Sequence, residues 1–228
     1  MPKINIKGVI VPNDDKRVYE YFEMDATSPA DVISAIEAAN GEPIEVEINS
    51  PGGDVFSGSE IYTALMGYAG GVTTKIVGVA ASAASVIAMA GNPAMISPTA
   101  EIMIHNVSMY AGGDYRGHEH AAQMLRDYND TIANAYMLKS GMEKGKLLEL
   151  MNQETWLTPQ QALEMGFVDE IMFTNTSTVR LAASASGLLP QEVITKVRNA
   201  LNDRAHFNLQ KIQATQNQLK LKGAKNEL

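Results

Sequence analysis

Apolar and polar positions in the first half of the chain recur with the periods of strands and helices. Residues 44–48 alternate strictly, as expected of a strand with one buried face. Alternation or β-branched runs predict strands at residues 4–12, 44–48, 73–77 and 100–105. Apolar residues at helical spacing predict helices at residues 25–40, 57–66 and 83–91. Strands and helices that follow each other in this way predict an α/β fold with a largely parallel sheet.

The second half of the chain has a mainly helical pattern. Residues 117–151 predict a long helical segment with a break near Gly141. Another helix is predicted at residues 158–166, because Thr158 is a favourable N-cap and a proline follows it. The compact domain is expected to end at residue 173.

The composition changes after residue 173. Residues 174–189 are rich in Ser, Thr and Ala, which is typical of a linker. Residues 190–228 are helix-prone, rich in Gln, Asn and Lys, and poor in large apolar side chains. The sequence therefore predicts a compact domain at 1–173, a linker, and a helical tail that serves assembly or partner binding. A frayed tail is the alternative.

Bulk composition narrows the function classes. The 228 residues carry a net charge of −8, which argues against a general nucleic-acid surface. The absence of cysteine excludes thiol catalysis, disulfides and thiolate metal sites. The first residues lack the apolar core of a signal peptide, and no apolar run has the length of a membrane span. We therefore expect a cytoplasmic protein that binds neither nucleic acid nor membrane.

Ser82 lies in a run of small residues, 78–85, that leads from a predicted strand into a predicted helix. At a helix N-terminus, free backbone N–H groups and the helix dipole favour negative charge. An oxyanion formed when this serine attacks a carbonyl would develop in that field. A structural N-cap is the alternative interpretation, because serine is common at that position.

Three further features could complete serine chemistry. His105 ends a predicted strand, where active-site residues of open α/β sheets gather, and it is the best general-base candidate among the four histidines. Adjacent glycines in residues 49–54 expose backbone N–H groups and permit positive φ, although a plain turn would also use them. Glu154 and Asp169 follow later in the chain, and either carboxylate could orient the imidazole.

Four sequence blocks occur together in an order and spacing that resemble a known family. They are INSPGG at 48–53, GVAAS at 78–82, MIH at 103–105, and WLT leading to GFVD at 156–169. With these blocks the chain resembles the Clp peptidase family of serine proteases, and more closely its phage and prophage relatives, the Clp-like prohead proteases. The resemblance implies the Clp peptidase/crotonase-like ββα-superhelix with a protruding helical handle, followed here by the C-terminal helical tail.

The resemblance also implies roles for residues at the site. Ser82 corresponds to the nucleophile and His105 to the general base, and Ser85 is the alternative nucleophile. The backbone N–H groups of Gly53 and Ala83 correspond to the oxyanion hole. These assignments imply peptide-bond hydrolysis through an acyl-enzyme.

The third member of the triad departs from the family pattern. The family has an aspartate two residues before an aromatic, and here Glu154 precedes Trp156 by two. Glutamate fills this role in some hydrolase triads, so Glu154 is the expected third member. Asp169 is the alternative.

The substrate is expected to bind as an added β-strand. The expected contacts are Gly52, Asp54, Val55, Gly112 and Gly113. No cofactor is expected, and no metal, because His118 and His120 would lie on different faces of a helix.

The resemblance implies a homo-oligomeric ring, a heptamer or tetradecamer, stacked through the helical segment at residues 123–145. The first predicted strand starts almost at Met1, without the segment by which housekeeping members dock an ATPase ring, so an ATPase partner is doubtful. We therefore expect a serine endopeptidase that processes phage capsid, portal or scaffold proteins. The alternatives are a housekeeping peptidase with an ATPase partner, a crotonase-type acyl-CoA enzyme, and a non-catalytic assembly protein.

Overall fold

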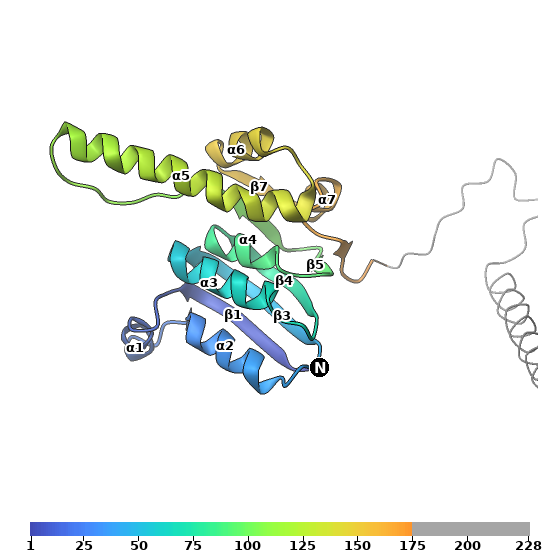
Figure 1. Ribbon diagram of the computed structural model, residues 1–228. Helices are drawn as coiled ribbons and strands as arrows, with labels where there is room; N and C mark the ends of the chain where they lie inside the picture. Colours follow the sequence, from blue (N-terminus) through green and yellow to red (C-terminus); the bar gives the residue numbers. More distant parts are fainter. Residues whose placement is uncertain (175–228) are drawn as a thin grey trace, which may run out of the picture. The chain divides into compact units, whose positions relative to one another are not determined.

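Eight strands form one sheet in residues 1–174, the part of the chain that the computed structural model describes (Figure 1). The strands are β1 (Lys3–Ile10), β2 (Ala26–Thr27), β3 (Ile44–Gly53), β4 (Val72–Ala81), β5 (Ala94–Ile96), β6 (Glu101–Ile104), β7 (Thr155–Leu157) and β8 (Glu170–Ile171). The sheet order is β2-β1-β3-β4-β5-β8, and every pair along it is parallel. Strand β6 also pairs with β4, and β7 joins β6 antiparallel. The predicted α/β fold with a largely parallel sheet is confirmed.

The helices lie between successive strands, as the alternating pattern predicts. They are α1 (Lys16–Tyr21), α2 (Pro29–Ala38), α3 (Val55–Met66), α4 (Ala83–Ala88), α5 (Tyr115–Ser140), α6 (Lys144–Asn152) and α7 (Pro159–Glu164). Helix α3 packs between α2 and α4 along the sheet, and α5 extends beyond the sheet at one end (Figure 1). The break predicted near Gly141 separates α5 from α6, where Gly141 has φ +70°.

The core forms where alternating strand positions face the helices. On β3, Ile44, Val46 and Ile48 are fully buried, while the residues between them are partly exposed. Each such side chain contributes roughly 1.5–3 kcal/mol through burial. The apolar positions of the alternating pattern therefore form the face of β3 that packs against the helices.

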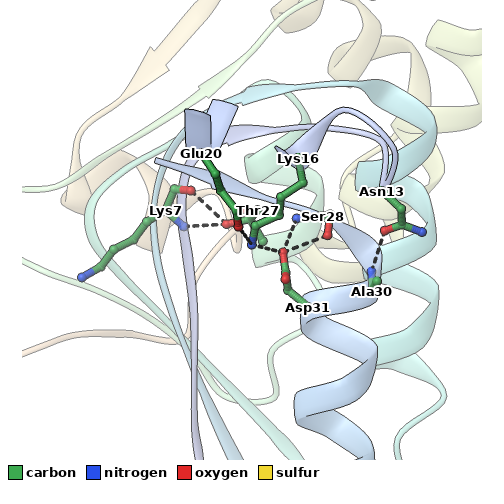
Figure 2. Close-up of polar contacts among 8 residues, drawn as sticks. All are labelled: Lys7, Asn13, Lys16, Glu20, Thr27, Ser28, Ala30 and Asp31. Carbon is green, nitrogen blue, oxygen red and sulfur yellow. Dashed lines mark hydrogen bonds and ion pairs between the residues drawn. The ribbon is translucent and has the colours of Figure 1, made fainter. Parts of the chain in front are cut away.

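The segment before α2 differs from the sequence prediction. The helix expected at 25–40 begins only at Pro29, and residues 16–21 form α1, which is too short to show a clear helical period. Figure 2 shows how α1 is held: Lys16 pairs with Asp31 near the start of α2. The Asp31 carboxylate also accepts hydrogen bonds from the Ser28 N–H and hydroxyl, both at 2.8 Å.

Strands β3 and β4 run further than their apolar patterns indicate. β3 continues through the Pro-Gly-Gly segment to Gly53, and β4 continues to Ala81. The β3–β4 register shifts after Ile48, and the Asn49 side chain fills the irregularity by accepting a hydrogen bond from the Val79 N–H at 3.1 Å. These extensions bring the two loops with candidate chemistry to the same end of the sheet.

The predicted tail lies beyond residue 174 and so outside the described residues, as does the linker except for its first residue. Within residues 1–174, no helix combines the length and the apolar character needed to cross a bilayer.

Candidate active site

Ser82 joins β4 to α4 in a backbone conformation that L-residues rarely adopt. Its φ is +53° and its ψ is −126°, a region that favours glycine because a Cβ is crowded there. Hydrogen bonds hold both sides of the residue: its N–H donates to the Met103 carbonyl, and its own carbonyl accepts from the Ser85 N–H, each at 2.9 Å. Strain of this kind persists only where the surroundings fix it, and it is concentrated at functional sites.

Replacing Ser82 by glycine is expected to stabilise the fold by about 1 kcal/mol. Relief of roughly 1–3 kcal/mol of strain exceeds the roughly 0.5–1 kcal/mol cost of glycine's chain entropy. Chemical denaturation measures the difference. In the matched control Ser59→Gly, on the exposed face of α3, the free energy of unfolding should fall by about 0.5 kcal/mol. Equal destabilisation in both variants would show that Ser82 carries no strain.

The Ser82 hydroxyl points at His105. His105 Nε2 lies 2.8 Å from Ser82 Oγ. The sheet produces this contact because β6 ends just before His105 and pairs with the last residues of β4, with Ala81 opposite Met103. The two candidates from neighbouring strand ends are therefore in direct contact, and both are only partly buried.

The glycine pair of β3 lies against the Ser82 loop. A Cβ on Gly52 would approach Ser82 Cβ to 2.7 Å and the Ala83 nitrogen to 2.9 Å, so only glycine allows this approach. Gly52 and Gly53 have φ of +93° and +151°, which also require glycine. The close approach brings the backbone of residues 52–53 beside that of residues 82–83, as an oxyanion site formed by Gly53 and Ala83 requires.

A cavity of about 360 Å³ opens beside Ser82 and His105. Its remaining wall is mostly apolar and comes from the starts of α3 and α4, the segment after His105, and α5. The wall includes Phe56, Val86, Val107, Met109, Met124, Tyr128, Ile132 and Tyr136. The α5 contribution was not predicted from the sequence, although Met124, Tyr128, Ile132 and Tyr136 recur at the four-residue spacing of one helical face.

The expected substrate contacts are only partly at the cavity. Val55 lines it, as does Asp54, whose carboxylate caps α3 by accepting from the Ser57 N–H at 2.7 Å and hydroxyl at 2.6 Å. Gly52 does not line the cavity, although its neighbour Gly53 does. Gly112 and Gly113 are exposed and do not line the cavity.

Ser85, the alternative nucleophile, is fully buried. Its hydroxyl donates to the Ser82 carbonyl at 2.6 Å and lies 2.8 Å from the Tyr136 hydroxyl. A serine without solvent access cannot attack a peptide, so the structure is inconsistent with that alternative.

The two candidate carboxylates have different surroundings. Asp169 accepts from the Ala94 N–H at 2.6 Å and pairs with Lys139 at 2.5 Å, beside the β5–β8 pairing. Glu154 is exposed and has φ +48°. Among the described residues, His105 has a side-chain hydrogen bond to Ser82 and none to either carboxylate.

No group of three or more His, Asp or Glu side chains in residues 1–174 is arranged to hold a metal ion. His118 and His120, on the exposed first part of α5, are included in this statement.

Comparisons with known proteins agree with this architecture. A family model for Clp protease matches residues 18–175. ATP-dependent Clp protease proteolytic subunit 1 of Chlamydia abortus is 31% identical over 172 residues, which are 71% of this chain and 88% of that protein. The ATP-dependent Clp protease proteolytic subunit of Deinococcus radiodurans is 32% identical over 133 residues, 58% of this chain and 65% of that protein. Subunit 1 of Protochlamydia amoebophila is 30% identical over 170 residues, 70% of this chain and 81% of that protein. The chain therefore belongs to the Clp protease family and is a serine-type endopeptidase.

Proposed function

We propose that Ser82 is the nucleophile and His105 the general base of peptide-bond hydrolysis. The observation that carries this proposal is the 2.8 Å contact between Ser82 Oγ and His105 Nε2. His105 takes the hydroxyl proton as Oγ attacks the peptide carbonyl, and then gives it to the departing amine. A water molecule, deprotonated by His105, then releases the acyl group and restores Ser82.

The backbone N–H groups of Gly53 and Ala83 stabilise the oxyanion in this proposal. It is supported by the close approach of Gly52 to Ala83 and by the place of Gly53 and Ala83 in the cavity wall. The substrate lies as an added strand along residues 52–55, and an apolar side chain of the substrate enters the cavity. A fluorophosphonate probe tests the assignment, because it labels only an activated serine.

Glu154 is proposed as the residue that orients His105. The proposal is supported by strand register: Ile104 lies opposite Thr155 in the antiparallel β6–β7 pair, so the next opposed positions are His105 and Glu154. The described side chains form no such hydrogen bond, so in this proposal the Glu154 carboxylate turns toward the imidazole.

Replacing Glu154 by alanine should lower turnover about 100-fold, because an unoriented imidazole is a poorer base. Asp169→Ala is the matched comparison. It should leave turnover nearly unchanged but lower the free energy of unfolding by about 1–3 kcal/mol, since the Ala94 N–H loses its carboxylate acceptor and Lys139 keeps only the Gly91 carbonyl. Hydrolysis of a peptide substrate and chemical denaturation measure both effects. If Asp169→Ala were instead inactive and as stable as the wild type, Asp169 would be the residue that orients His105.

The natural substrates are proposed to be phage head proteins, namely capsid, portal or scaffold. Supporting this are the resemblance to the Clp-like prohead proteases and the residues beyond 175, which lie outside the family match. In this proposal residues 174–189 are a linker, residues 190–228 form a helical tail for assembly, and the catalytic domain forms a heptameric or tetradecameric ring.

A housekeeping role with an ATPase partner is the second candidate, favoured by relatives named ATP-dependent proteolytic subunits. The two roles separate experimentally. Co-expression with neighbouring virion genes should yield trimmed head proteins with the active chain and untrimmed ones with Ser82→Ala, as seen by mass spectrometry. Head proteins that stay intact, together with degradation that requires an added ATPase, would favour the housekeeping role.

A further inference from the structure

Two buried hydroxyl groups connect α5 to the backbone of Ser82. Ser85 lies on α4 and Tyr136 near the end of α5, and their side-chain oxygens are 2.8 Å apart. The Ser85 hydroxyl is also 2.6 Å from the Ser82 carbonyl oxygen. Ser85 and Tyr136 are 0% and 1% exposed, so water does not compete for these contacts.

The donor and acceptor roles in this series of hydrogen bonds follow from the Ser82 carbonyl oxygen, at which the series ends. A carbonyl oxygen can only accept, so the single Ser85 proton is donated to Ser82. The Tyr136 hydroxyl must then donate to Ser85 Oγ. Burial raises the pKa of Tyr136 above its ordinary value, which keeps this donor proton in place. Consecutive hydrogen bonds with the same direction in a low-dielectric site strengthen one another.

The series of hydrogen bonds ends at Ser82, the residue whose backbone is strained. The Ser82 carbonyl accepts from both the N–H and the hydroxyl of Ser85, at 2.9 and 2.6 Å. The Ser82 N–H also donates to the Met103 carbonyl. These contacts together fix the two peptide units that flank Ser82, whose φ is +53°. A loss of the hydroxyl contact leaves one bond fewer to hold the conformation that directs Oγ toward His105.

We propose that Ser85 and Tyr136 are positioning residues, which hold Ser82 in its attacking geometry and make that geometry depend on the placement of α5. The proposal rests on Ser82 being the nucleophile. Tyr136 is suited to this role because its ring packs against Phe167, 5.7 Å between centroids, and also lines the cavity beside Ser82.

Tyr136→Phe and Ser85→Ala test the proposal in the full chain, because each removes one hydroxyl and little else. The probe is a fluorophosphonate, and the limiting rate of Ser82 labelling is measured together with the half-saturating probe concentration. Each variant should label about tenfold more slowly, with the half-saturating concentration nearly unchanged. The double variant should be no slower than the slower single variant, since the two hydroxyls act as one unit.

Thr74→Val is the matched control. Thr74 is fully buried, and its hydroxyl donates to the Ala88 carbonyl at 2.9 Å, at the end of α4 remote from Ser82. This variant should lose a comparable amount of thermal stability and keep the wild-type labelling rate.

The outcomes separate this inference from the proposed function. Slow labelling in Tyr136→Phe and Ser85→Ala, but not in Thr74→Val, supports positioning. Wild-type labelling rates in both hydroxyl variants, with lowered melting temperatures, would reduce the pair to a structural role and leave the proposed nucleophile intact. No Ser82 label on the folded wild-type protein would remove the proposed nucleophile, and the positioning role with it.

Discussion

Ser82→Ala should abolish peptide hydrolysis without unfolding the protein. Loss of the attacking oxygen removes the acyl-enzyme route, and the rate should fall by roughly 10⁵–10⁶. The backbone conformation of residue 82 is fixed by hydrogen bonds that alanine retains, so the melting temperature should stay close to that of the wild type. Hydrolysis of a fluorogenic peptide with an apolar residue before the cleaved bond measures the rate.

Ser108→Ala provides the control for this experiment. Ser108 lines the same cavity, but among the described contacts the His105 imidazole bonds only the Ser82 hydroxyl. Its replacement should leave the rate within a few-fold of wild type. If Ser82→Ala retained activity while Ser108→Ala lost it, the nucleophile would have been assigned to the wrong cavity serine.

His105→Ala should produce a loss of similar size, roughly 10⁵-fold. Without the imidazole, no described side chain accepts the Ser82 proton, and the hydroxyl is a weak nucleophile. The same variant should resist labelling by a fluorophosphonate, because labelling uses the same activated oxygen.

Two other histidines give a stringent comparison. His118 and His120 are exposed on α5, and neither lines the cavity. Their alanine variants should hydrolyse peptides at the wild-type rate. Full activity in His105→Ala would contradict the general-base assignment, whatever the behaviour of the others.

Ser82 and His105 could be paired from the sequence because the carboxyl ends of parallel strands lie at the same edge of a sheet. Loops that follow neighbouring strands meet at one edge of a sheet, so a serine after β4 and a histidine after β6 could be expected to approach each other. The glycine pair was recognisable for a similar reason, since it follows the strand predicted at residues 44–48. Alternation on β3 also predicted the buried face correctly.

The apolar cavity wall was harder to predict. Helix α5 contributes Met124, Tyr128 and Ile132 to the cavity, but their spacing only indicates a helical stripe and does not say what it faces. That depends on how α5 packs beside the sheet, which is a tertiary property. The same packing brings Tyr136 to Ser85, residues that are 51 positions apart in the chain.

The carboxylate that orients His105 was hard to predict for a different reason. Chain order offered both Glu154 and Asp169, and among the described residues no side-chain hydrogen bond joins either carboxylate to His105. Asp169 has hydrogen-bond and ion-pair partners beside the β5–β8 pairing. The proposal of Glu154 rests on the antiparallel β6–β7 register, which the three residues of β7 establish. A three-residue strand leaves too little alternation to be predicted from sequence.

Mass-spectrometric mapping of a fluorophosphonate label on the wild-type chain tests the central claim most directly. We expect a single modified residue, Ser82, and no label in His105→Ala or Ser82→Ala. A label on another residue, or an intact folded protein with no label at all, would contradict it.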